Sequence, residues 1–144
     1  MPDVTFSAKA ESKSHTKTVV NTRDFTITID EPENLGGKNE GPNPVEYVLA
    51  GLAGCLNVVG NLVAQEMDIN INNLSFELEG DLNPAKFSGK SDKDRAGYKE
   101  IRVKINIDSD ADRETLQKWM EKVEDRCPVS DNISNNTPLK ISLN

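Results

Sequence analysis

The sequence is poor in the residues that most often bind metals or carry acid–base catalysis. Among its 144 residues there is a single histidine, and there are only two cysteines. A structural zinc ion usually needs four His or Cys ligands, so we expect no metal site. No Ser-His-Asp or Cys-His arrangement is indicated either, because nothing in the sequence places His15 near a thiol.

The two cysteines are too few for the disulfide framework of a small secreted protein. Cys55 and Cys127 lie in different halves of the chain. In a reducing compartment such a pair is not expected to form a structural disulfide. The thiols are therefore either small buried hydrophobic groups or redox-active groups.

Positive charge is scarce as well. The 17 lysines and arginines are outnumbered by 24 aspartates and glutamates, which gives a net charge of −7. Nucleic acids and anionic membranes are bound by clustered Lys and Arg, so we expect neither as a partner. The first residues show no basic region followed by an apolar run, and polar residues interrupt the apolar stretch in mid-chain. We therefore expect no signal peptide, no membrane span and a soluble cytoplasmic protein.

The most prominent feature that is present is the apolar stretch 44–67, which predicts one long helix. Its apolar residues recur at steps of three and four, the period of one helix face. Pro44 suits a first helical turn, and Asn43 is suited to cap it. A helix this long and apolar is expected to be the core element of the fold.

Three glycines in this helix predict close packing by a neighbour. Gly51, Gly54 and Gly60 each cost roughly 1 kcal/mol of helix stability relative to alanine. We expect the neighbour to be another long helix, for example the same helix of a second subunit. The modest apolar content of 35% agrees with a core that a partner chain completes.

The rest of the chain predicts antiparallel strands and a second helix. Strands are expected at 4–10, 16–21, 25–29, 69–82, 98–107 and 139–143, and a helix at 110–126, capped by Ser109 or Asp110 and ended by Pro128. A short new turn is expected at 128–133, and long loops at 30–42 and 83–97, the latter either a solvated excursion or a lid. The order predicts an α+β fold in a single domain 1–144, with parts 1–42, 43–67 and 68–144.

Each cysteine is expected on the buried face of an amphipathic helix. Cys55 lies on the apolar face of the long helix. Cys127 lies where the second helix stops, near the start of the turn at 128–133, where free backbone N–H groups favour a thiolate. Both helices would press on the same sheet, so a meeting of the two thiols is geometrically feasible.

The same residues resemble a known family. The motifs are Gly41-Pro-Asn-Pro, Leu49-Ala-Gly-Leu-Ala-Gly-Cys55, Ile101-Arg-Val and Arg126-Cys127-Pro128-Val129. They resemble the OsmC/Ohr family, the osmotically inducible and organic hydroperoxide resistance proteins, from about Phe25 to the end of the chain. The resemblance implies an intertwined homodimer with two long central helices between antiparallel sheets built from both chains, and no cofactor.

The resemblance also implies a chemistry, the thiol-dependent reduction of organic hydroperoxides in oxidative stress defence. Cys55 would be the peroxidatic cysteine, oxidised to a sulfenic acid, and Cys127 would resolve it to a disulfide. An external dithiol reductant would then restore both thiols.

One part of the family pattern differs in this sequence. Val45 stands where characterised members have glutamate, and Glu46, one step later, lies about 180° round the helix from Cys55. A cation is expected to hold the thiolate, and Arg23 and Arg126 are the candidates. Two other functions stay open: a non-peroxidatic dimer that binds a small hydrophobic or thiol ligand in its interface cavity, and a structural protein with core cysteines.

Overall fold

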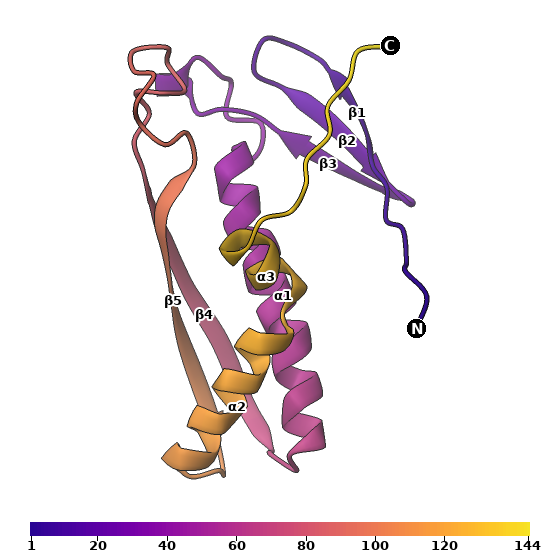
Figure 1. Ribbon diagram of the computed structural model, residues 1–144, viewed down its shortest axis with the longest axis vertical. Coiled ribbons are helices and arrows are strands. Elements are labelled where there is room, and N and C mark those ends of the chain that lie inside the picture. The colour runs from indigo at the N-terminus through magenta and orange to yellow at the C-terminus, as the bar shows by residue number, and fades with distance from the viewer. The chain divides into compact units, whose positions relative to one another are not determined.

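The computed structural model describes residues 1–144 and has the expected α+β fold with antiparallel sheets. The chain forms two compact units, residues 1–48 and 49–144. Unit 1 contains the N-terminal sheet and the first turn of the long helix. Unit 2 contains the rest of that helix and all later elements (Figure 1).

The sheet of unit 1 has three antiparallel strands in the order β1-β2-β3. The strands are β1 Lys9–Ser12, β2 Thr18–Thr22 and β3 Phe25–Ile29. The predicted strand at 4–10 is wrong in position, because four residues of β2, Thr18 to Asn21, pair with a partner that begins only at Lys9. Val4 and Phe6, the apolar residues behind that prediction, are 71% and 90% exposed.

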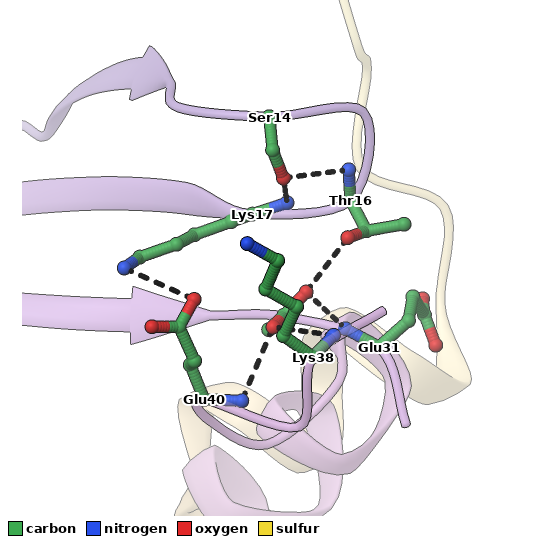
Figure 2. A network of polar contacts seen from close by, with 7 residues as sticks. Ser14, Thr16, Lys17, Glu31, Lys38 and Glu40 are labelled. Carbon is green, nitrogen blue, oxygen red and sulfur yellow. Dashed lines mark hydrogen bonds and ion pairs between the residues drawn. The ribbon is translucent and has the colours of Figure 1, made fainter. Parts of the chain in front are cut away.

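The loop at 30–42 is built around a buried carboxylate. Asp30 is 1% exposed and accepts hydrogen bonds from the Thr16 hydroxyl at 2.8 Å and from the backbone N–H groups of Glu31, Lys38 and Glu40 at 2.8, 3.2 and 3.1 Å (Figure 2). Burial raises the pKa of Asp30, but the four donors outweigh it and hold the pKa at about 2, below its usual 3.8. The network ties three separate segments of unit 1 to one side chain.

The same loop contains a short 3₁₀ helix, η1 Glu33–Leu35. Gly37 follows it, and a Cβ at this position would lie only 1.9 Å from the Glu31 carbonyl oxygen. No residue other than glycine fits such a close approach of two backbone segments.

The long helix is observed as α1 Pro44–Glu66, which confirms the prediction within one residue. Its start is capped reciprocally. The Glu46 N–H donates to Asn43 Oδ1 at 2.9 Å, and the Asn43 N–H donates to Glu46 Oε2 at 2.8 Å. This is the arrangement of a capping box, and it confirms Asn43 as the cap.

By length and composition alone, α1 could cross a membrane. The core helix of a globular protein has the same two properties. In unit 2 the buried residues of α1 are Leu52, Leu56, Val59, Gly60, Val63 and Ala64.

Unit 2 places α1 against a long hairpin and two further helices. Strands β4 Ile71–Leu82 and β5 Tyr98–Ser109 pair antiparallel. The register shifts between Ile71 and Asn73. The loop 83–97 joins the strands and leaves Phe87 80% exposed; its role as excursion or lid stays a prediction.

Helices α2 Arg113–Arg126 and α3 Pro128–Ser134 complete unit 2. The break at Pro128 and the short turn after it are confirmed. The predicted cap of α2 is wrong, because the Asp112 side chain accepts the Thr115 N–H at 2.8 Å. Asp110 instead accepts the Asn70 N–H, which ties the end of β5 to the start of β4.

Gly60 on α1 and Trp119 on α2 pack closely in unit 2. Trp119 is 1% exposed, and its Nε1–H donates to the Gly60 carbonyl oxygen at 2.8 Å. A Cβ on Gly60 would lie 3.1 Å from the indole ring. The neighbour predicted for Gly60 is therefore α2 of the same chain and not a helix of a second subunit.

The predicted last strand at 139–143 is absent. Residues 135–144 form no helix or strand, and Leu139, Ile141 and Leu143 are 82%, 86% and 100% exposed. A strand needs a hydrogen-bonded neighbour, and the chain supplies none to this segment.

The Asp30 network predicts a pH-dependent contribution to stability. In Asp30→Asn, the side-chain NH₂ group would face backbone N–H groups that now donate hydrogen bonds to the carboxylate. Donors would then face donors, so we expect a lower urea midpoint at pH 7. The folded pKa of about 2 lies below the ordinary 3.8, so this stabilisation is present above about pH 4 and is lost as the pH falls towards about 2. Urea titrations of wild type and variant should show a difference that narrows over this range.

The matched control for this measurement is Asp24→Asn, in the exposed turn between β2 and β3. Its urea midpoint should stay close to that of the wild type. Equal midpoints for Asp30→Asn and wild type at pH 7, or a difference that does not change between pH 7 and about pH 2, would contradict the role given to the carboxylate.

Candidate functional site: a dithiol pair in unit 2

Cys55 is positioned by the buried face of α1. Leu52, one turn earlier, and Leu56 and Val59 on its other side are all buried. The Cys55 thiol itself is only half-buried. A thiol at the edge of a core is accessible to a small reactant while its helix is held rigidly by packing.

Cys127 is positioned by a helix break. It ends α2 and caps α3, because Pro128 lacks the N–H that α2 would need to continue. Its sulfur accepts the Ser130 N–H at 3.4 Å, and its carbonyl oxygen accepts the Asp131 N–H at 2.9 Å. The residue is completely buried.

The structure brings the two predicted cysteines together. Cys127 Sγ lies 3.0 Å from Cys55 Sγ, and both thiols are free. A disulfide bond is shorter, about 2.05 Å. The two sulfurs form a dithiol pair that needs only a small movement, and the loss of two protons and two electrons, to become a disulfide.

The surroundings of Cys55 favour its protonated form. Burial raises the pKa of the Cys55 thiol, and the adjacent Cys127 sulfur raises it further, because two sulfurs so close together cannot readily both be charged. The backbone N–H of Val129 acts in the opposite direction, since it donates a hydrogen bond to the Cys55 sulfur.

The predicted supporting residues make other contacts within the chain. Arg126 forms a two-pronged ion pair with Glu66, with N–O distances of 2.5 and 3.1 Å. Arg23, in unit 1, has its guanidinium 4.9 Å from the centre of the Phe25 ring. Glu46 serves the helix cap described above. A supporting role for Arg23, Arg126 or Glu46 at the thiols stays a prediction.

Unit 2 contains a cavity of about 290 Å³, whose wall is formed by neighbours of the two cysteines and not by the cysteines themselves. Its wall includes Leu52 and Leu56, which flank Cys55 on α1, and Ser130, which bonds to Cys127. The other lining residues come from β5, α2 and α3: Ile101, Val103, Ile105, Met120, Val123, Glu124, Ile133 and Ser134. The cavity is mostly apolar, with polar groups contributed by the helices.

Sequence reasoning missed this cavity and the contact between Trp119 and Gly60. The residues of β5 that line it were predicted only as part of the strand at 98–107. Trp119 was covered only by the predicted helix at 110–126. A buried tryptophan needs a partner for its N–H, and this signal could have pointed to a close polar contact, although not to Gly60. No group of three or more His, Cys, Asp or Glu side chains that could hold a metal is present.

Comparison with known proteins agrees with the fold. The family model for OsmC-like proteins matches residues 37–142. A protein of Mycoplasma genitalium named hydroperoxide reductase is 28% identical over 120 residues, which cover 83% of this chain and 79% of that protein. The organic hydroperoxide resistance protein OhrB of Bacillus subtilis is 30% identical over 121 residues, 83% of this chain and 81% of OhrB.

Solved structures show the same fold. The crystal structure of an OsmC-like protein from Mycoplasma pneumoniae superposes with a TM-score of 0.80 at 23% identity, covering 92% of this chain and 89% of that one. The extent of the family match, from the loop before α1 to the last residues of the chain, shows that this protein belongs to the OsmC-like family.

Proposed function

We propose that this protein is a cytoplasmic thiol-dependent peroxidase that reduces organic hydroperoxides by a Cys55/Cys127 dithiol cycle. The observation that carries the proposal is the distance of 3.0 Å between the two sulfurs. The relatives named hydroperoxide reductase and OhrB support the substrate class. Oxidative stress defence is the corresponding role.

The cycle begins with attack of the Cys55 thiolate on the terminal oxygen of the hydroperoxide. The O–O bond breaks, and the alkoxide takes up a proton and leaves as the alcohol. Cys55 is now a sulfenic acid. The Cys127 sulfur attacks the Cys55 sulfur, water leaves, and a disulfide forms. An external dithiol then reduces the disulfide by two exchange steps, so that each turnover converts one hydroperoxide to one alcohol and one water.

The exposure of the two thiols favours Cys55 as the nucleophile. Cys127 is completely buried, whereas Cys55 is half-buried and lies between Leu52 and Leu56, two residues of the cavity wall. Cys55 Sγ also receives a hydrogen bond from the Val129 N–H, which lowers its pKa. A backbone donor of this kind stabilises a thiolate.

Replacement of each thiol separates their roles. With dithiothreitol as reductant and cumene hydroperoxide as substrate, Cys55→Ser should consume peroxide no faster than a protein-free control. Cys127→Ser should still form a sulfenic acid on Cys55, detectable as a dimedone adduct by mass spectrometry. Because burial raises the pKa of Cys55, wild-type turnover should increase as the pH rises through neutrality.

Asp131→Asn, on α3 next to the site, is a control that keeps both thiols. Equal rates of peroxide consumption for wild type and Cys55→Ser would contradict the peroxidase proposal. The ligand-binding alternative would then remain, and the apolar cavity is the observation that supports it. A dimedone adduct on Cys127 in place of Cys55 would reverse the assignment of the nucleophile.

The proposal includes a homodimer formed through one face of α1. Gly51 and Gly54 are exposed, and a Cβ on either would meet nothing within 4 Å in the chain. Val58 and Leu62, at the following steps of four, are 66% and 46% exposed. An exposed apolar stripe that begins with two glycines fits the close approach of a second copy of the helix. The exposed, alternating apolar residues at 139–143 fit a strand that forms only when another chain offers a sheet edge.

A bulky side chain on this stripe should prevent dimerisation and leave the chain folded. The Cβ of Gly54→Leu would lie in open space in the single chain, so the circular dichroism spectrum should not change. We expect sedimentation equilibrium to give a dimer for wild type and a monomer for Gly54→Leu at the same concentration. Gln117→Leu, exposed on α2, should remain dimeric; a monomeric wild type or a dimeric Gly54→Leu would contradict this interface.

A further inference from the structure

A methionine lies in the wall of the cavity beside the dithiol pair. The chain has three methionines. Met1 is fully exposed at the N-terminus, and Met67 packs against the core of unit 2 without lining this cavity. Met120, on α2, is partly buried and lines the cavity. A thioether is oxidised to a sulfoxide by the same class of reactant that oxidises a thiolate.

We propose that the cavity admits the alkyl group of the hydroperoxide and that Met120 is a second, non-catalytic oxidation site within it. This inference rests on the proposed function for its reactant. The Met120 sulfur attacks the terminal oxygen of the hydroperoxide, and the O–O bond breaks. The alkoxide takes the proton from the transferred oxygen and leaves as the alcohol, while the sulfur becomes a sulfoxide.

The composition of the wall selects the reactant. Seven apolar side chains line the cavity in addition to Met120: Leu52, Leu56, Ile101, Val103, Ile105, Val123 and Ile133. At about 290 Å³ the cavity lies near the lower limit of small-molecule sites, roughly 300 Å³. It therefore suits an alkyl or aryl group of modest size. Hydrogen peroxide has no apolar surface to bury and gains nothing from such a wall.

The position of Met120 gives its oxidation a consequence. A sulfoxide places a polar oxygen among apolar side chains, where it lacks the hydrogen bonds it has in water. Binding of an apolar group in the cavity is weakened as a result. A thioether is also a weaker nucleophile than a thiolate, so Met120 reacts only when hydroperoxide exceeds what the dithiol removes. Excess substrate would therefore reduce its own binding.

The test compares two oxidants on full-length Cys55→Ser, which does not consume peroxide catalytically. Equal concentrations of cumene hydroperoxide and hydrogen peroxide are added, and sulfoxide at each methionine is quantified by peptide mass spectrometry. The ratio of Met120 to Met67 oxidation should be roughly tenfold higher with cumene hydroperoxide, the gain expected from burying about two methylene equivalents. The same ratio with both oxidants would overturn the inference.

Two variants on α3 show whether the cavity is responsible. Ile133 lines the cavity and is 36% exposed, so Ile133→Trp should narrow the cavity and abolish the difference between the oxidants. Asn132→Trp, one residue earlier and not in the wall, should leave the difference between the oxidants unchanged. A loss of the difference in Asn132→Trp, or its persistence in Ile133→Trp, would contradict the site.

The result of the Met120 oxidation test can be distinguished from the result of the peroxidase assay. A wild type without peroxidase turnover whose Met120 still reacts selectively would overturn the catalytic cycle and keep the cavity site. Normal turnover without selective Met120 oxidation would keep the catalytic cycle and overturn the cavity site.

Discussion

The geometry of the dithiol depends on the contact between Trp119 and Gly60. The indole N–H donates to a carbonyl oxygen of α1 at 2.8 Å, and a Cβ on residue 60 would lie 3.1 Å from the ring. Cys55 is five residues from Gly60 along α1, and Cys127 is eight residues from Trp119 along the chain. Helices that approached less closely would hold the two sulfurs farther apart. The cost of a glycine in mid-helix, roughly 1 kcal/mol, is offset by this contact.

The helix break after α2 completes the geometry. Pro128 redirects the chain so that Cys127 both ends one helix and starts the next. The backbone N–H groups that α3 cannot use internally are then directed at sulfur, Ser130 at Cys127 and Val129 at Cys55. The ion pair of Arg126 with Glu66 ties the end of α2 to the end of α1. Two rigid elements thus hold the thiols in contact beside an apolar cavity, which is the arrangement that the proposed peroxidase chemistry needs.

The sequence predicted the elements whose signals are local. The bounds of α1 follow from its three-to-four periodicity and its Asn43 cap, and the end of α2 follows from Pro128. The strand at 25–29 was predicted at its observed bounds. Each of these depends on residues close to one another in the chain, where propensity and capping act directly.

What could not be predicted depends on distant partners. The strand at 4–10 was misplaced because pairing with β2, and not local alternation, decides where the strand begins. The strand at 139–143 does not form without a neighbour. Asp112 caps α2 although Ser109 and Asp110 are equally suitable by type. The family resemblance paired Cys55 with Cys127 and assigned their roles. Their separation, the cavity wall and the Gly60–Trp119 contact depend on packing between elements, which periodicity does not specify.

The proposed chemistry requires Cys55 and Cys127 to act as one redox pair within a single chain. A non-reducing peptide map of the fully reduced wild-type protein, taken after addition of one equivalent of organic hydroperoxide, tests this pairing. We predict a single disulfide that joins the Cys55 and Cys127 peptides of the same chain, with no free thiol remaining. Thiols that stay free, or a disulfide between two chains, would contradict it.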